Sequence, residues 1–140
     1  MKALSIIEPW ASLIKERVKH IETRSWQTKY RGVLYIHASK KKLTKSELAE
    51  HGELLGLLKD KDFQYGHLIA KCKLVDCRLM TAELISEVKK NHKEYVSGFY
   101  EVGRYAWVLE DIEVLETPIP VRGSLGLWAV EEAMLGEVAA

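Results

Sequence analysis

Apolar and polar residues alternate along much of the chain, and this pattern predicts a fold rich in β-strands. Side chains of a strand point to opposite faces in turn, so a half-buried strand has apolar residues at every second position. Segments with this pattern, or with runs of β-branched and aromatic residues, cover residues 2–7, 20–26, 33–38, 67–77 and 104–116. A last strand is expected at the end of the Pro- and Gly-containing segment 118–130.

Apolar residues recur at helical spacing in three other segments. These predicted helices cover residues 9–18, 44–60 and 81–91. The second begins with Thr44 and Glu47, whose spacing is typical of a capping box. The last residues, 131–140, are expected to form a short helix or a frayed end. Because strands and helices do not alternate in a strict βαβ order, the sequence predicts an α+β protein with a mixed sheet or small β-barrel and about three packed helices.

Length and composition fit one soluble domain covering residues 1–140. The chain is 47% hydrophobic and 29% charged, which is typical of a globular protein rather than a disordered one. No apolar run approaches the ~20 residues of a membrane-spanning helix. Polar residues interrupt the N-terminal segment, and no signal-peptide cleavage site follows it. We therefore expect a cytoplasmic protein that does not bind a membrane.

Positive charge is concentrated in one part of the chain. Residues 15–45 contain ten Lys or Arg and two acidic residues, so they carry a net charge of +8. The whole chain has a net charge of +1, and the remaining residues therefore carry −7. Such an asymmetry indicates a surface for a polyanion or a phosphate-bearing ligand, although chance clustering of surface charges would give the same count.

Motifs for metal ions and phosphate loops are missing from the sequence. Cys72 and Cys77 are an odd number of positions apart on one predicted strand. Their side chains should face opposite sides, where they cannot share a metal or a disulfide. The five histidines show no ligand spacing, and His37 is the one to examine. We therefore predict no metal and no cofactor.

The basic segment that includes the predicted strand 20–26 allows three interpretations. Alternation would place four of its side chains on one face: His20, Glu22, Arg24 and Trp26. The first interpretation is an exposed ion pair of Glu22 with Arg24 or Lys19, which would contribute under ~1 kcal/mol. The second is nucleic-acid binding, and the third is catalysis with Lys19 as a base whose pKa is lowered by desolvation.

Nucleic-acid binding would use several kinds of side chain from this part of the chain. A carboxylate accepts a hydrogen bond from a base, cationic groups bind phosphate, and an indole stacks on the base. The residues predicted for these contacts are Trp10, Lys19, Glu22, Arg24, Trp26, Arg31, Lys40 and Lys41. Two further residues, Tyr105 and Arg122, are candidates for the rim of the cleft, whereas Trp107 and Trp128 are expected to pack in the core.

The stretch RVKHIETRSW resembles the G-x-K-x-x-E-x-R signature of the ASCH domain, the activating signal cointegrator homology domain. Lys19, Glu22 and Arg24 match the signature, while Arg17 stands where the family has glycine. Other stretches are similar to the cointegrator-like branch in the same order: LSIIEPWASLI, YGHLIAKCKLVDC and GRYAWVLEDIEVLETPIPVRGSLGLWAV. The resemblance therefore covers residues 2–131, and residues 131–140 would be a C-terminal extension.

This resemblance implies a PUA-like fold, a small mixed β-barrel with helices packed around its openings. It also implies a cleft between the barrel and the first helix, and binding of RNA or another single-stranded nucleic acid in transcription or translation. Some relatives are amidohydrolases that act on acetylated cytidine with a lysine, a threonine and a glutamate. Lys19 matches that lysine, but Glu22 stands in place of the threonine.

The leading expectation is therefore a domain that binds nucleic acid, RNA above all, or a nucleotide in a basic cleft. The alternative is an amidohydrolase that acts on a modified nucleoside, with Lys19 as the base and Glu22 as its polar partner. A protein-interaction module is a third possibility. The sequence leaves open RNA against DNA against free nucleoside, the base preference and the oligomeric state.

Overall fold

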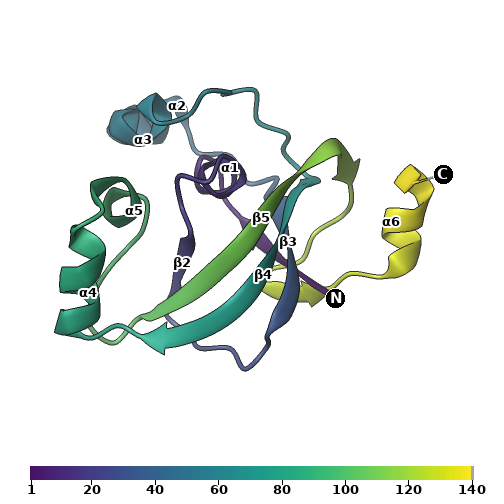
Figure 1. The fold of residues 1–140 in the computed structure, drawn as a ribbon. Coiled ribbons are helices and arrows are strands. Elements are labelled where there is room, and N and C mark those ends of the chain that lie inside the picture. The colour runs from purple at the N-terminus through teal and green to yellow at the C-terminus, as the bar shows by residue number, and fades with distance from the viewer. Residues whose placement is uncertain (140) are drawn as a thin grey trace.

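One strongly curled sheet organises the fold in a computed structural model of the chain (Figure 1). The structure describes residues 1–139, and only the backbone of residues 136–139. Its strands are β1 (Lys2–Ile6), β2 (Ile21–Arg24), β3 (Gly32–Ala38), β4 (His67–Leu79), β5 (Tyr105–Pro120) and β6 (Leu127–Ala129). They lie in the order β2-β5-β4-β3-β1-β6. Strands β1 and β3 are parallel and the other pairs are antiparallel, so the sheet is mixed.

Bulges between the long antiparallel strands β4 and β5 explain much of the curl. The register between these strands shifts at three points, between Leu68 and Ala70, between Lys71 and Lys73, and between Leu74 and Asp76. The first shift leaves three extra residues on β5, and each of the other two adds one residue on one strand. Such irregularities bend the sheet and increase its twist. The result is a half-barrel with helices around it, which confirms the predicted α+β class and agrees with a PUA-like architecture.

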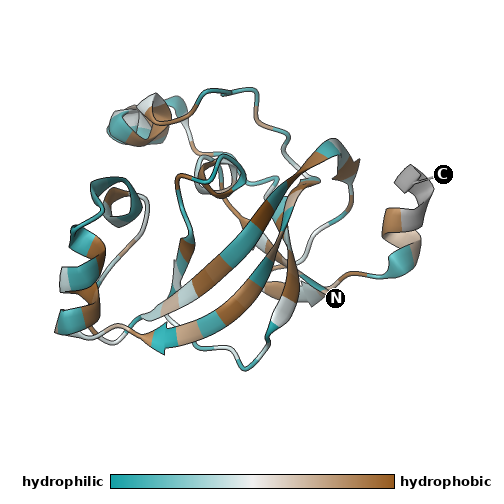
Figure 2. Cartoon of the chain, in the orientation of Figure 1, coloured by the Kyte–Doolittle hydropathy of each residue, from teal (hydrophilic) through white to brown (hydrophobic). Residues whose placement is uncertain are grey.

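The two faces of the sheet bury different sets of apolar side chains. Ala3 and Leu4 are neighbours in β1, yet Ala3 packs with Tyr35 and Leu68 while Leu4 packs with Trp107. The larger cluster also contains α1 (Trp10–Lys15), which lies over the concave side of the sheet in Figure 1. Figure 2 shows the corresponding alternation of hydrophobic and hydrophilic residues along β4 and β5.

Six short helices are present among residues 1–139, more than the sequence predicts. Besides α1 they are α2 (Lys45–Glu50), α3 (Gly52–Gly56), α4 (Ala82–Lys89), α5 (His92–Val96) and α6 (Glu132–Ala139). The predicted helix 44–60 is broken at His51, although its capping box is confirmed because the Glu47 amide donates to Thr44 Oγ1. Helix α5 was not predicted. None of these helices has the length and apolar character needed to cross a membrane.

Two other sequence predictions need correction at their ends. The predicted helix 9–18 ends at Lys15, and the predicted strand 20–26 is β2, which ends at Arg24. Trp26 therefore lies beyond the strand and does not continue the face of Glu22 and Arg24.

The turn between α1 and β2 has a left-handed residue at the position where the family has glycine. Arg17 has φ +61°, a conformation that costs an ordinary residue roughly 1–2 kcal/mol. Its Nε and Nη2 atoms donate to the Ile112 carbonyl at 3.1 and 2.7 Å, and these hydrogen bonds compensate for the strain. The turn therefore forms without glycine and leads directly into Lys19.

Candidate functional site

Lys19 is the buried centre of a polar network. Its side chain has an exposed fraction of 0%. Its Nζ atom donates to the Ser97 carbonyl at 2.7 Å and lies 3.5 Å from Glu22 Oε1. Desolvation lowers the pKa of this ammonium, and the negative charges of Glu22 and Glu94 oppose that shift. Lys19 thus joins β2 to the segment that follows α5.

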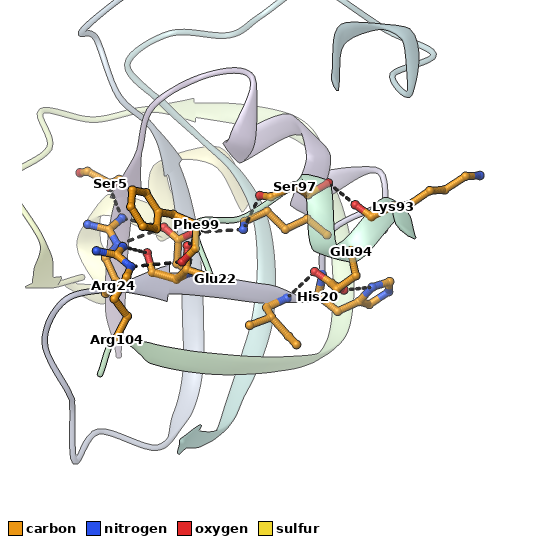
Figure 3. A network of polar contacts seen from close by, with 12 residues as sticks. Ser5, His20, Glu22, Arg24, Lys93, Glu94, Ser97, Phe99 and Arg104 are labelled. Carbon is orange, nitrogen blue, oxygen red and sulfur yellow. Dashed lines mark hydrogen bonds and ion pairs between the residues drawn. The ribbon is translucent and has the colours of Figure 1, made fainter. Parts of the chain in front are cut away.

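Glu22 and Arg24 form the outer part of the same network (Figure 3). Arg24 donates to Glu22 Oε2 from Nε at 3.0 Å and from Nη2 at 2.8 Å, and Nη2 also donates to the Ser5 carbonyl at 3.1 Å. Glu22 Oε1 accepts from the Thr23 amide at 3.2 Å and faces Lys19. The exposed ion pair considered from the sequence is therefore wrong, because Glu22 and Lys19 are buried.

A second buried carboxylate, Glu94 of α5, fastens this helix to β2. It accepts hydrogen bonds from the His20 amide at 2.8 Å and the Ile21 amide at 3.2 Å. His20 Nδ1 lies 3.2 Å from the same carboxylate (Figure 3). These contacts hold the segment after α5, including the carbonyl of Ser97 that binds Lys19.

The network forms part of the wall of a cavity of about 900 Å³. This space is within the range of ligand-binding pockets. Its wall comes from β1, α1, β2, α3, the segment after β3, the segment 95–104 and residues 125–126 before β6. Four cationic side chains and one carboxylate line it: Lys19, Arg24, Lys41, Arg104 and Glu22. The cavity therefore favours a negatively charged ligand.

Aromatic side chains line the same cavity. Trp10 packs edge-on against His51, with ring centroids 4.9 Å apart, and Tyr95 stacks on Tyr100 at 5.6 Å. Phe99 is 58% exposed, and the Arg104 guanidinium lies 4.4 Å from the centroid of its ring. The cavity thus combines cationic groups with flat apolar surfaces.

The hydroxyl group of Tyr100 is buried and has no hydrogen-bond partner among the described atoms. Burial raises the pKa of this phenol, so it stays protonated and able to donate at neutral pH. A buried hydroxyl without a partner costs about 1–3 kcal/mol. The close approach of Gly98 contributes to its position, because a Cβ there would lie 2.8 Å from Tyr100 Cε2. The hydroxyl oxygen is covered, so a ligand in the cavity can accept from it only after neighbouring side chains shift.

Five of the eight residues predicted for binding line this cavity: Trp10, Lys19, Glu22, Arg24 and Lys41. Lys40 instead lines a neighbouring cavity, as does Arg122. Trp26 packs edge-on against Trp107 at 4.8 Å, and its ring lies beside Gly126 outside both cavities. Arg31 is also outside both cavities, and its Nη2 atom forms an exposed ion pair with Asp76 Oδ1 at 3.8 Å.

The cavity also contains residues that the sequence analysis missed. Phe99, Tyr100 and Arg104 lie in the segment 97–104. The sequence predicts no helix or strand for residues 97–103, and Arg104 is the first residue of a predicted strand. A glycine followed by two aromatic residues and an arginine in a connecting segment is a usable signal, because functional side chains are concentrated on loops held by a rigid scaffold.

A curled mixed sheet, a helix on its concave side and a charged cavity between them define a small α+β domain of the PUA-like kind. A family model for the ASCH domain matches residues 4–119, and the chain belongs to the ASCH domain family. This confirms the resemblance inferred from the signature.

Two relatives are full proteins with the name "Activating signal cointegrator 1". The one from Homo sapiens is 26% identical over 139 residues, and the one from Mus musculus is 25% identical over the same length. Each match covers 91% of this chain and 22% of the relative. The chain therefore spans about a fifth of the length of these relatives.

Proposed function

We propose that the large cavity binds a nucleotide unit and that the domain is a nucleic-acid-binding module, with RNA as its preferred ligand. The observation that carries this proposal is the meeting of the Lys19–Glu22–Arg24 network with the aromatic side chains of Trp10 and Phe99 around one cavity. Cationic groups there match a phosphate, and the flat faces of Trp10 and Phe99 match a base.

The contacts proposed here differ from those predicted from the sequence. Glu22 has its lone pairs occupied by Thr23, Lys19 and the two donors of Arg24, so it positions Arg24 rather than accepting from a base. Lys19 contributes positive charge from beneath the wall. Arg24, Arg104 and Lys41 are the cations that meet phosphate, and Tyr100 donates to the ligand once the side chains that cover its hydroxyl shift. A role in transcription or translation is part of the proposal.

Filter binding of a labelled mixed-sequence RNA, and of single-stranded DNA, tests this function at two salt concentrations. Lys41→Ala removes an exposed cavity charge without disturbing the network. We expect it to weaken binding several-fold and to reduce the salt dependence by about 0.7 in slope, the contribution of one phosphate contact on a single strand. Arg24→Ala should weaken binding at least tenfold.

Matched controls lie on β4. Lys73→Ala and Arg78→Ala each remove one positive charge, as the cavity variants do, but from exposed positions outside both cavities. Each should leave the affinity for nucleic acid unchanged. If Lys41→Ala and Arg24→Ala bind as tightly as the wild type and with the same salt dependence, the cavity does not bind nucleic acid.

A second candidate is an amidohydrolase acting on a modified nucleoside such as acetylated cytidine. The observation in its favour is the buried Lys19 with a lowered pKa on the wall of a cavity large enough for a nucleoside. A neutral amine there would take a proton from the attacking water, with Glu22 as its polar partner. Chromatography of cytidine released from acetylated cytidine tests it. Release that Lys19→Met abolishes supports the enzyme, and no release by the folded wild type excludes this substrate.

A further inference from the structure

A second cavity adjoins the first. It has a volume of about 570 Å³ and shares Ser5, Ser39 and Leu125 with the wall of the large cavity. Two cations, Lys40 and Arg122, line it together with serine residues, and no acidic residue is among its described lining residues. His37 is also in its wall, and burial lowers its pKa, so the imidazole adds no positive charge at neutral pH. The second cavity therefore offers two positive charges and hydroxyl groups, the chemistry of a phosphate site.

The wall of this second cavity is held in place before any ligand binds. Ser5 Oγ donates to the Ser124 carbonyl at 2.8 Å and accepts from Trp128 Nε1 at 3.0 Å. His37 Nε2 donates to the Val121 carbonyl at 3.1 Å. Gly123 lies against the His37 ring so closely that a Cβ would be 2.4 Å from Cε1. Preorganisation of this kind reduces the entropy lost on binding.

Lys40 is also positioned by packing. Its Cε and Cγ atoms would lie 3.0 and 3.1 Å from a Cβ on Gly66, so the stem of the lysine lies directly over the glycine backbone. Gly66 has φ +79° and donates to the Ala38 carbonyl at 2.7 Å, which fixes the backbone there. The ammonium group is therefore held near the second cavity although the residue is exposed.

Leu125 stands on the boundary between the two cavities. Its side chain is 98% exposed, and it lines both spaces. A fully exposed leucine between two cationic cavities suits a strand whose bases lie against it while its phosphates bind on either side. Apolar side chains placed between successive bases are a known means of separating them.

We propose that the ligand is a single-stranded nucleic acid that occupies both cavities. One nucleotide lies in the large cavity, the next phosphate binds Lys40 and Arg122, and the nucleic-acid strand passes over Leu125. This inference rests on the proposed function, because it requires a nucleotide in the large cavity. It adds that the ligand is a polynucleotide strand, for which a free nucleotide is only a partial substitute.

Fluorescence anisotropy with a labelled mixed-sequence RNA of eight nucleotides tests this arrangement, and a mixture of the four mononucleotides serves as competitor. The variant is the double substitution Lys40→Ala and Arg122→Ala, and the matched control is Lys73→Ala with Arg78→Ala. The variant is expected to bind the octamer at least tenfold more weakly, with a salt slope lower by about 1.4 for two lost phosphate contacts. The inhibition constant of the mononucleotides at the large cavity, corrected for the weaker octamer binding, should be unchanged.

A second variant, Leu125→Ser, keeps all charges and alters an exposed position. It should weaken octamer binding several-fold, and more than it weakens binding of the mononucleotides. If both variants bind the octamer like the wild type while Arg24→Ala does not, the ligand is confined to the large cavity, and the inference fails while the proposed function stands. If a duplex of the same sequence binds as tightly as the single strand, the inference also fails. If Arg24→Ala changes neither ligand, the proposed function itself fails.

Discussion

The Arg17 guanidinium donates two hydrogen bonds to the Ile112 carbonyl, and Arg17 stands where the family signature has glycine. The backbone of Arg17 is left-handed, with φ +61°, at the turn that leads to Lys19. The Arg17 side chain thus stabilises a left-handed backbone conformation at a position where the family signature has glycine, the residue that adopts this conformation without strain.

Substitution of Arg17 separates the two effects. Arg17→Ala keeps the left-handed strain and loses the hydrogen bonds, whereas Arg17→Gly loses the bonds but also the strain. We expect the alanine variant to be less stable than the glycine variant by about 1 kcal/mol. Urea unfolding measures the difference, and equal stability of the two variants would contradict a left-handed residue at this position.

The pH dependence of stability reports the state of Lys19. Burial lowers its pKa below the usual 10.5, so between the lowered value and 10.5 the unfolded chain binds more protons than the folded one. Stability from this group therefore rises with pH through that window. The unfolding free energy of the wild type minus that of Lys19→Met should grow as the pH rises toward 10.5, by up to ~1.4 kcal/mol per pH unit. A difference that falls with pH would mean that the ion pair with Glu22 outweighs desolvation.

Removal of the Tyr100 hydroxyl should separate stability from binding. Tyr100→Phe eliminates a buried donor without a partner, and we expect it to raise the unfolding free energy by ~1 kcal/mol while weakening RNA binding. Tyr30→Phe is the control, because the Tyr30 hydroxyl donates to the Val33 carbonyl and its loss should destabilise the fold by ~1 kcal/mol. Urea unfolding and anisotropy measure both properties. Destabilisation by Tyr100→Phe would show that its hydroxyl has a partner.

The two cysteines should differ in reactivity. Burial raises the pKa of Cys72 to about 12, so at about pH 8 only about one thiol in ten thousand is ionised. Cys77 is half-buried. Ellman's reagent should therefore titrate one thiol rapidly in the folded protein and both in denaturant, and Cys77→Ser should abolish the rapid phase. A rapid phase in that variant would contradict the burial of Cys72.

The sequence predicts the sheet well because local patterns determine it. Alternation identified the strands, and the signature placed Lys19, Glu22 and Arg24 together. Alternation does not predict the end of β2, because Trp26 is a residue type common in strands. The strand ends before Trp26 because this side chain packs on Trp107, a contact between residues far apart in the chain.

The rest of the site could not be predicted for a similar reason. Phe99, Tyr100 and Arg104 reach the cavity because Glu94 and Ser97 bind α5 and its following segment to β2. These hydrogen bonds join residues more than 70 positions apart, and no periodicity within either segment encodes them. The short helix α5 is five residues long and gives too weak a pattern to recognise.

The pairing of β6 with β1 determines when the sheet can be completed during synthesis. Residues 127–129 complete the edge of the sheet beside residues 2–4, and Ser5 holds Ser124 on the boundary between the cavities. During synthesis, the first strand leaves the ribosome long before its last partner exists, and contacts between such distant residues form late. A nascent chain therefore carries Lys19, Glu22 and Arg24 from an early stage, but it acquires the assembled cavity walls only when residues 127–129 have emerged.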